Sequence, residues 1–327
     1  MMEKVLVTGG AGYVGAVLVP KLLESGYNVK VIDTMWFGKE CLDSVKDKCE
    51  IIKGDIRDYK LVDECLNGID YVIHLAAISN DPCSDLNPEI TKQVNFEATK
   101  ELVKRAKEKG VKRFIYASSS SVYGIKEEPN VTEELPLEPL TIYSQTKVWA
   151  EEVVKQANDE NFTTVIIRPA TVCGYSPRLR LDLTVNILTE HAINKGKITV
   201  FGGEQKRPNI HIEDITDYYI QLLKTPKEKI AGKIFNAGYE NHALIEIAEM
   251  VKKVVGKQIK IERTETKDLR SYRISSEKIK KELGLEPKKT ILDAVADLKE
   301  AFDSGLIPNS SDTIYRNIER MKELNIK

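Results

Sequence analysis

The 327-residue sequence has few of the features that mark secreted, membrane or nucleic-acid-binding proteins. Its five cysteines are odd in number and none forms a CxxC pair, which predicts free thiols in a reducing cytoplasm and no cysteine metal site. No apolar run approaches the length of a membrane span, and no basic-then-apolar leader precedes the first apolar strand. The formal net charge of -1 supplies no overall field for nucleic acid or an anionic membrane. We therefore expect a cytoplasmic, globular protein with no metal, nucleic-acid or membrane partner.

Short apolar runs alternate with helical patterns over about the first 170 residues. The runs are continuous rather than alternating, as in parallel strands that are buried on both faces. They lie at 5–7, 27–32, 51–52, 71–77, 114–117 and 165–170. Strands that alternate with helices in this way predict an α/β fold built on a doubly wound parallel sheet.

A glycine-rich turn connects the first run to the first helical pattern. Gly9 permits a tight turn, Gly12 lets a pyrophosphate approach the helix N-terminus, and Gly15 lets the helix pack closely on the strand. Asp33 ends the second run, about 20 residues further on, where an acid accepts hydrogen bonds from the adenine ribose. Because a carboxylate repels a 2′-phosphate, the sequence favours NAD over NADP.

Other residues at the carboxyl ends of the runs are candidates for the same cofactor. Asp55 and Ile56 could edge and cover an adenine, although Asp58 could simply cap the next helix. Asn95 lies in the middle of a long predicted helix (88–109), where its poor helix propensity suggests a hydrogen-bonding role. His74 is expected to be a structural strand residue bonded to the backbone. The expected cofactor contacts beyond the glycines and Asp33 are Tyr13, Val14, Asp55, Ile56, Leu75, Ala76, Ala77, Asn95, Arg168 and Pro169.

Tyr143 and Lys147 form a pair with a possible catalytic role. They are four residues apart, so they share one face of a helix that begins at or near Thr141. A lysine ammonium lowers the pKa of a tyrosine hydroxyl from about 10 and so makes it a usable general base. The pattern alone is also compatible with a packed tyrosine beside a solvated lysine. Four serines, 118–121, end the fifth run, where one hydroxyl could hold a substrate oxygen or the segment could be a polar turn.

The second half of the chain has a different pattern, with basic loops between helices. Arg178, Arg180, Arg207, Arg270 and Arg273 come from three separate loops. If they converge, they form a pyrophosphate site, with Arg207 as the best single candidate; the alternative is a solvated basic face. Asp214 is expected to cap a helix that runs to Leu223.

Together these stretches resemble one known family. TGGAGYVG, Asp33, GDIRD, HLAA, SSSSVYG, YSQTK, RPATVCG and RPNIHIED occur in the order and spacing of the extended short-chain dehydrogenase/reductases, in the UDP-glucose 4-epimerase-like branch of nucleotide-sugar epimerases and dehydratases. The resemblance implies a Rossmann domain at 1–170 that holds NAD tightly and is joined by later segments. It also implies a smaller, mainly substrate-binding mixed α/β domain at 171–327.

The same resemblance implies roles for individual residues. Tyr143 would be the base, Lys147 its partner and a ligand of the nicotinamide ribose, and Ser119 the catalytic serine. A homodimer would form through the helix at 90–108 and the helix that carries Tyr143. Contacts with a nucleotide-diphosphate sugar are expected from Ser79, Ser120, Thr171, Arg178, Arg180, Arg207 and Arg270.

Departures from the family pattern narrow the reaction. The 4,6-dehydratases carry Asp-Glu where this chain has Ser120 and Ser121, so dehydration is disfavoured. Thr171 and Cys173 stand where several relatives have an asparagine for the sugar. The leading expectation is an NAD-dependent nucleotide-sugar epimerase that acts at C4 through a transient 4-keto sugar. The alternatives are a 4-dehydrogenase or 4-ketoreductase of surface-polysaccharide (deoxysugar or heptose) synthesis and, less favoured, a 4,6-dehydratase or a non-catalytic NAD-binding protein.

Overall fold

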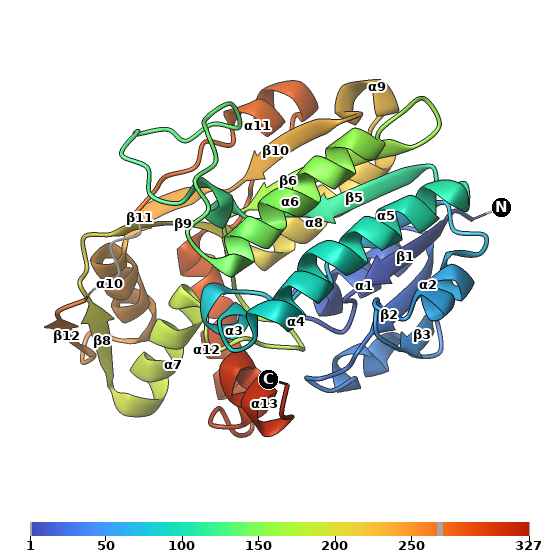
Figure 1. Ribbon diagram of the computed structural model, residues 1–327. Helices are drawn as coiled ribbons and strands as arrows, with labels where there is room; N and C mark the ends of the chain where they lie inside the picture. The colour runs from blue at the N-terminus through green and yellow to red at the C-terminus, as the bar shows by residue number, and fades with distance from the viewer. Residues whose placement is uncertain (1, 267–270, 327) are drawn as a thin grey trace.

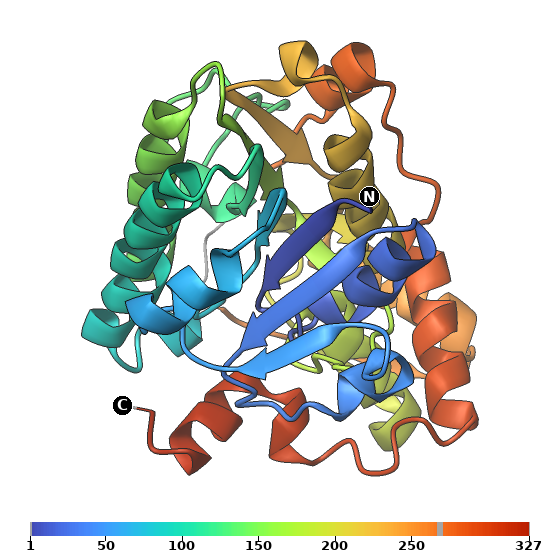
Figure 2. The same cartoon turned by 90° about the vertical axis from the view of Figure 1, so that its right-hand side faces the viewer.

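A seven-stranded sheet forms the centre of the protein in the computed structural model, which describes residues 2–266 and 271–326. All its pairings are parallel, and the strand order is β10-β6-β5-β4-β1-β2-β3. Helices cover both faces of the sheet (Figures 1 and 2). The prediction of a doubly wound α/β fold is therefore confirmed. The strands are β1 (Lys4–Thr8), β2 (Asn28–Asp33), β3 (Glu50–Lys53), β4 (Tyr71–His74), β5 (Arg113–Ala117), β6 (Thr163–Pro169) and β10 (Lys233–Ala237).

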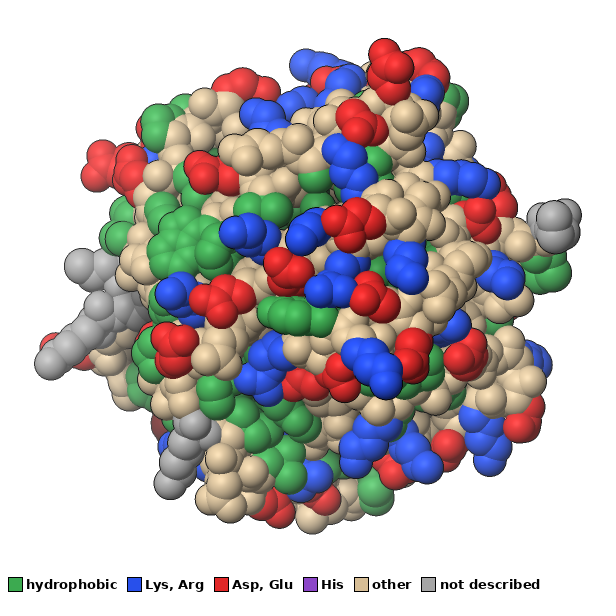
Figure 3. Space-filling model, turned by 45° about the vertical axis from the view of Figure 1, so that its right-hand side comes forward, with side chains coloured by type: hydrophobic (Ala, Val, Ile, Leu, Met, Phe, Trp, Pro, Cys, Tyr) green, Lys and Arg blue, Asp and Glu red, His purple; other side chains and the backbone are tan. Residues whose placement is uncertain are grey.

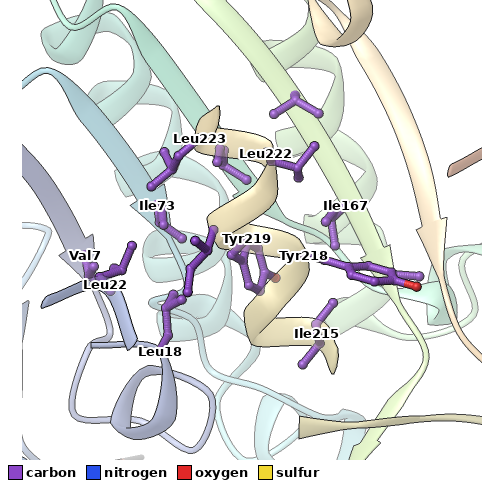
Figure 4. Close-up of a cluster of buried hydrophobic side chains, with 14 of the residues drawn as sticks. Val7, Leu18, Leu22, Ile73, Ile167, Ile215, Tyr218, Tyr219, Leu222 and Leu223 are labelled. Atoms are coloured by element: carbon purple, nitrogen blue, oxygen red, sulfur yellow. The ribbon is translucent and has the colours of Figure 1, made fainter. Parts of the chain in front are cut away.

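Neighbouring residues on each strand enter two different cores, which explains why the apolar runs do not alternate. Val5 and Val7 pack in one cluster with residues of α1 (Gly15–Glu24) and α8 (Ile212–Lys224), while Leu6 packs in the other. Figure 4 shows Ile215, Tyr219 and Leu222 of α8 directed toward the strands in the first cluster. The second cluster lies under α2 (Tyr59–Leu66), α5 (Ala98–Glu108) and α6 (Ile142–Ala157).

The long helix predicted at 88–109 is divided into three consecutive segments. They are α4 (Pro88–Lys92), a π-helical turn η2 (Gln93–Glu97) and α5. Asn95 lies in the π turn. Such turns are rare and frequently occur at functional sites.

The edge strand β10 comes from the second half of the chain and pairs with β6. Its Asn236 accepts a hydrogen bond from the Tyr123 hydroxyl at 2.7 Å. No local pattern could specify its place in the central sheet, because that place depends on pairing with a distant segment.

The rest of the second half forms two small sheets and a helical layer beside one end of the large sheet (Figure 1). The three-stranded sheet is β11 (Glu240–Ala243), β9 (Lys206–His211) and β7 (Thr171–Cys173), and the two-stranded sheet is β12 (Lys260–Thr264) with β8 (Lys197–Phe201). Helices α7 (Thr184–Lys195), α10 (Leu244–Val255) and α12 (Ile291–Asp303) share a third apolar core. The shorter elements are α3 (Asp81–Ser84), α9 (Lys227–Ile230), α11 (Glu277–Leu283), α13 (Asn317–Glu323), η1 (Glu40–Val45), η3 (Ser120–Tyr123) and η4 (Thr313–Tyr315).

The expected capping role of Asp214 is wrong. His211 caps α8, with its Nδ1 accepting a hydrogen bond from the backbone N–H of Glu213 at 3.1 Å. Asp214 lies inside the first turn of that helix. Its carboxylate accepts backbone hydrogen bonds from Lys288 and Lys289 instead, so it anchors the segment before α12.

The surface mixes acidic and basic side chains, with apolar atoms gathered in a few patches on the face shown in Figure 3. Within the described residues, we find no helix whose length and apolar character would allow it to cross a membrane.

Candidate functional site

A cavity of about 400 Å³ lies at the carboxyl ends of the central strands. Strand β1 pairs with β2 on one side and β4 on the other, and ligands of doubly wound sheets bind beside such a switch in strand order. The wall includes most of the residues that the sequence had nominated. These are Gly9, Gly12, Tyr13, Val14, Gly15, Asp33, Asp55, Ile56, Leu75, Ala76, Ala77, Ser79, Ser119, Ser120, Tyr143, Lys147, Pro169, Thr171, Arg178, Arg180 and Arg207.

The glycine turn leaves no room for side chains at two of its positions. Gly9 has a φ of 74°, and a Cβ there would lie 2.7 Å from the backbone nitrogen of Ala76. A Cβ on Gly15 would lie 2.5 Å from the Gly9 carbonyl oxygen. Backbone therefore comes to the surface of the cavity at the N-terminus of α1, where free N–H groups and the helix dipole favour an anion. The cradle fits a dinucleotide pyrophosphate.

Two acids mark one end of the cavity. The carboxylate of Asp33 accepts hydrogen bonds from the backbone N–H groups of Met35 at 2.7 Å and Ala11 at 3.0 Å, which fixes its position beside the glycine turn. Asp55 is bonded to Arg57. Asp58 caps α2, which is the alternative that the sequence left open for this residue. This arrangement fits the adenosine end of NAD, with Asp33 facing the ribose.

Tyr143 and Lys147 reach the cavity from the first turns of α6. Thr141 caps this helix, because its hydroxyl accepts a hydrogen bond from the Ser144 N–H while the Ser144 hydroxyl receives one from the Thr141 N–H. Lys147 Nζ donates to the carbonyl oxygen of Ala117 at 2.7 Å and lies 5.9 Å from the centre of the Tyr143 ring. The cap thus fixes the start of the helix, and the end of β5 fixes the lysine.

Burial changes the titration of both residues. It raises the pKa of Tyr143 to about 12, although a hydrogen bond with Ser119 offsets part of the increase. It lowers the pKa of Lys147 to about 7, with a partial opposing effect from Glu151. Without a ligand, the chain therefore holds Tyr143 protonated at neutral pH. Additional positive charge in the cavity would favour the phenolate.

The four serines at the end of β5 have different partners. Ser118 donates to the buried carboxylate of Glu151, and Ser120 Oγ lies 3.3 Å from the hydroxyl of Tyr272. Ser119 caps η3, accepts hydrogen bonds from Ser121 and also bonds Tyr143. Of the four serines, the structure thus places Ser119 beside the tyrosine hydroxyl.

Two nominated cofactor residues lie behind the wall rather than in it. The side-chain amide of Asn95 bonds both the N–H and the carbonyl of Ile78 at 2.8 and 3.0 Å, which supports the loop that lines the cavity. Arg168 makes two hydrogen bonds with Glu151, at 2.9 and 2.6 Å, and one with the Tyr123 hydroxyl at 2.8 Å. Both residues are therefore positioned to support the site from behind.

His74 is structural, as expected, but it is bonded to side chains rather than to the backbone. Its Nδ1 lies 2.6 Å from the hydroxyl of Thr8, and its Nε2 lies 2.8 Å from that of Thr99. Burial is the main cause that lowers the pKa of His74 to about 3, and Lys147 adds to the effect.

This histidine should make folding sensitive to mild acid. The unfolded residue takes up a proton below its ordinary pKa of about 6.5, whereas the folded one stays neutral down to about pH 3. The free energy of unfolding should therefore fall as the pH drops from 6.5, and His74→Gln should remove up to about 1.4 kcal/mol per pH unit of that fall. Urea unfolding between about pH 5 and 6.5 measures it. If the free energy of unfolding fell equally steeply with decreasing pH in the variant and in the wild type, the buried His74 would not be the cause.

The arginine loops converge only in part. Arg178, Arg180 and Arg207 line the same cavity, whereas Arg273 is not part of its wall among the described residues. Arg180 pairs with Asp182 at 2.9 Å and donates to Ser79 at 3.1 Å. Arg270 lies outside the described residues.

Sequence reasoning missed several residues of the wall. They are Trp36 and Phe37 after β2, Asp81 on α3, Tyr219 on α8, Tyr272, and Asn317 at the start of α13. None belongs to a recognisable sequence motif. Tyr219, Tyr272 and Asn317 reach the cavity from distant parts of the chain. Trp36 and Phe37, which closely follow Asp33 in the sequence, could have been nominated, because aromatic side chains are common in ligand pockets.

The cavity and its residues define a Rossmann-fold enzyme in which a tyrosine and a lysine on one helix face a dinucleotide cradle. Residues 5–238 match the model of the NAD dependent epimerase/dehydratase family, and the chain belongs to this family. The expected family, the use of NAD and the assignment as an NAD-dependent epimerase are confirmed.

Individual relatives agree with this assignment. The chain is 32% identical over 272 residues to a UDP-glucose 4-epimerase of Lactobacillus helveticus, covering 77% of this chain and 82% of that protein. It is similar to the crystal structure of a UDP-glucose 4-epimerase from Thermotoga maritima with UDP-glucose, at a TM-score of 0.84, 25% identity and coverage of 93% and 99%. A UDP-glucuronic acid 4-epimerase from Bacillus cereus, in complex with UDP-glucuronic acid and NAD, gives a TM-score of 0.81, 28% identity and coverage of 92% and 99%.

Proposed function

We propose that this enzyme interconverts the C4 epimers of a UDP-linked sugar through a transient 4-keto sugar. The observation that carries the proposal is the placement of the Tyr143 hydroxyl beside Ser119 in the same cavity as the glycine cradle. The epimerase names of the relatives described above support both the reaction and the UDP group.

The chain's own residues suffice for the proton transfers. NAD, which the glycine turn and Asp33 would hold, would supply the hydride-transfer chemistry at C4. Tyr143, as phenolate, takes the proton of the C4 hydroxyl and later gives it back, while the Ser119 hydroxyl holds the sugar oxygen. Lys147, fixed on the Ala117 carbonyl and with a pKa of about 7, adds positive charge beside the tyrosine in its protonated form. The keto sugar must turn over in the cavity between the two hydride transfers.

Arg207 is our candidate for the substrate pyrophosphate. It lies on β9 and lines the cavity, and the paired strand β7 carries Thr171, which lines the same cavity. A guanidinium offers two parallel N–H groups to phosphate oxygens, so it suits this role better than a point charge.

The test is to incubate the purified enzyme with UDP-glucose, UDP-galactose, UDP-N-acetylglucosamine and UDP-glucuronic acid and to follow the products by NMR and NADH by absorbance. We expect an equilibrium mixture of C4 epimers of at least one sugar, with no net formation of NADH. Stoichiometric NADH with a released keto sugar would instead make the enzyme a 4-dehydrogenase. A 4-keto-6-deoxy product would make it a dehydratase, against the hydroxyls found at Ser120 and Ser121.

We also propose a cytoplasmic homodimer formed through α5 and α6, which lie side by side on the front of the molecule in Figure 1. Phe96 and Trp149 stack edge to face there with ring centres 5.5 Å apart, and Trp149 is 36% exposed. All five cysteines are free thiols, which supports a reducing compartment.

A Trp149→Glu substitution should therefore halve the mass in solution, because a charge at the centre of an apolar interface cannot be solvated. Light scattering coupled to gel filtration measures the mass. Leu306→Glu is the matched control, since Leu306 is 58% exposed and lies far along the chain in the turn after α12. An unchanged mass for Trp149→Glu would exclude this interface.

A further inference from the structure

Arg178 is a buried cation with unused hydrogen-bonding capacity in the cavity wall. Its side chain stacks on Phe37, with the guanidinium carbon 3.9 Å from the ring centre, and the residue is only 5% exposed. One terminal nitrogen donates to Asn317 Oδ1 at 2.6 Å, while Nε and the other terminal nitrogen have no partner among the described residues. An unpartnered buried donor is costly, and more so when it is charged. The position therefore calls for an acceptor, and an anion suits it best.

The surroundings of Arg178 locate that anion. Ser176 donates to the carbonyl oxygen of Tyr13, and the Tyr13 hydroxyl donates to that of Gly174, at 2.7 and 2.6 Å. The segment 174–178 therefore lies directly on the glycine turn. Asp33, the ribose acid, is among the charged neighbours of Arg178. The guanidinium thus lies between the anion cradle and the ribose end of the cofactor cavity.

We propose that Arg178 binds the pyrophosphate of the dinucleotide through these two free N–H positions. The phosphate group of a Rossmann ligand lies at the N-terminus of the first helix, next to the ribose acid, which is where Arg178 is directed. Each of the two free nitrogens can donate a charge-assisted hydrogen bond to a different phosphate oxygen. The glycine turn would hold one side of the pyrophosphate, and an arginine from the second half of the chain would hold the other. This assigns Arg178 to the cofactor, in place of the role in sugar-nucleotide binding that the sequence suggested.

Helix α13 positions this arginine. Asn317, at its first turn, accepts the hydrogen bond from Arg178 and also donates its backbone N–H to Asp182 at 3.1 Å. Arg320 on the same helix donates to the carbonyl oxygen of Trp36 at 2.8 Å, next to Phe37. The helix thus connects the guanidinium and the aromatic ring on which it stacks, so Asn317 is a positioning residue for the phosphate contact.

The test compares adenosine-containing ligands with and without phosphate groups. Cofactor-stripped full-length protein is titrated by calorimetry with NAD, ADP, 2′-AMP and adenosine. For Arg178→Met, which keeps an unbranched side chain over Phe37, we expect affinity for NAD and ADP to fall about 10- to 100-fold, as for loss of hydrogen bonds to a charged group. Adenosine affinity should stay unchanged, and the dependence of ADP binding on salt should become shallower.

Two further variants separate loss of the phosphate contact from general damage to the protein. Arg263→Met, at an arginine that is 52% exposed and paired with Glu204, is the matched control and should change nothing. Asn317→Leu keeps the Arg178 guanidinium but removes the hydrogen-bond acceptor that positions it. Affinity for ADP should therefore fall less than in Arg178→Met, and affinity for adenosine should stay unchanged. Equal losses for ADP and adenosine, or no loss for either, would overturn the proposal. A loss confined to 2′-AMP would overturn it as well, because it would assign Arg178 to a 2′-phosphate. The result does not depend on which sugar the enzyme accepts.

Discussion

Tyr143→Phe is expected to lower kcat about 10²- to 10⁴-fold, the range that a positioned general acid–base group contributes. The change removes only the hydroxyl that bonds Ser119 and leaves the ring packed in the wall of the cavity. The proton of the sugar hydroxyl then has no acceptor at the point where the hydride leaves. Steady-state rates of epimerisation measure the loss.

Binding measurements separate this loss from damage to the site. Calorimetric titration of Tyr143→Phe with NAD should give nearly the wild-type affinity, because the glycine cradle and Asp33 are untouched. Tyr239→Phe is the matched control, since Tyr239 is 46% exposed and should keep full activity. A Tyr143→Phe enzyme that kept wild-type kcat would show that another group takes the proton.

Arg168→Met is expected to destabilise the fold by about 3–5 kcal/mol, as for one partner of a buried ion pair. The side chains of Arg168 and Glu151 are 3% and 4% exposed. Among the described residues, the substitution leaves the buried carboxylate with Ser118 as its remaining side-chain donor. Chemical unfolding monitored by circular dichroism measures the change in the free energy of unfolding.

The double variant tests whether the uncompensated charge causes this loss. Glu151→Gln removes the charge while keeping an acceptor, so Glu151→Gln/Arg168→Met should be clearly more stable than the sum of the two single changes predicts. The control is Lys197→Met. Lys197 pairs with Glu262 at the surface, both side chains are about half exposed, and the expected loss is about 0–1 kcal/mol. Additive effects at Glu151 and Arg168 would contradict a coupled pair.

Local rules account for the parts of the fold and site that the sequence could predict. Gly9 and Gly15 are recognisable because their spacing, directly after a strand and at the start of a helix, is a local pattern. Thr141 and the Tyr143–Lys147 pair follow from helix capping and helical spacing, both of which are properties of a few consecutive residues.

Whether a nominated residue lines the cavity depends on the direction of its side chain. Arg168 and Pro169 are adjacent on β6, yet only Pro169 lines the cavity, because successive strand residues point to opposite faces. Val94 and Asn95 are likewise adjacent in the π turn, and only Val94 reaches the wall. A one-residue difference of this kind is fixed by tertiary packing and cannot be read from residue type.

The sequence analysis missed other residues because their partners lie far away along the chain. Asn317 and Tyr272 reach the cavity from more than a hundred residues beyond Tyr143, and neither belongs to a motif. Asp214 is of a residue type that commonly caps helices, but His211 takes that role and leaves its carboxylate to bond Lys288 and Lys289. In the same way, the partners of Arg178 are Phe37 and Asn317, which are distant in the sequence and which no local pattern indicated.

The position of β10 at the edge of the central sheet has a consequence for the order of synthesis. When the ribosome has made residues 1–170, β6 already has β5 on one side, but its other edge is unpaired until Lys233–Ala237 emerges. At about 5–20 residues per second, the nascent chain carries this open edge for several seconds. An unpaired strand edge is a template for association with other chains. A polypeptide that stops near residue 170 would keep that edge permanently, so it should aggregate rather than persist as a free cofactor-binding domain.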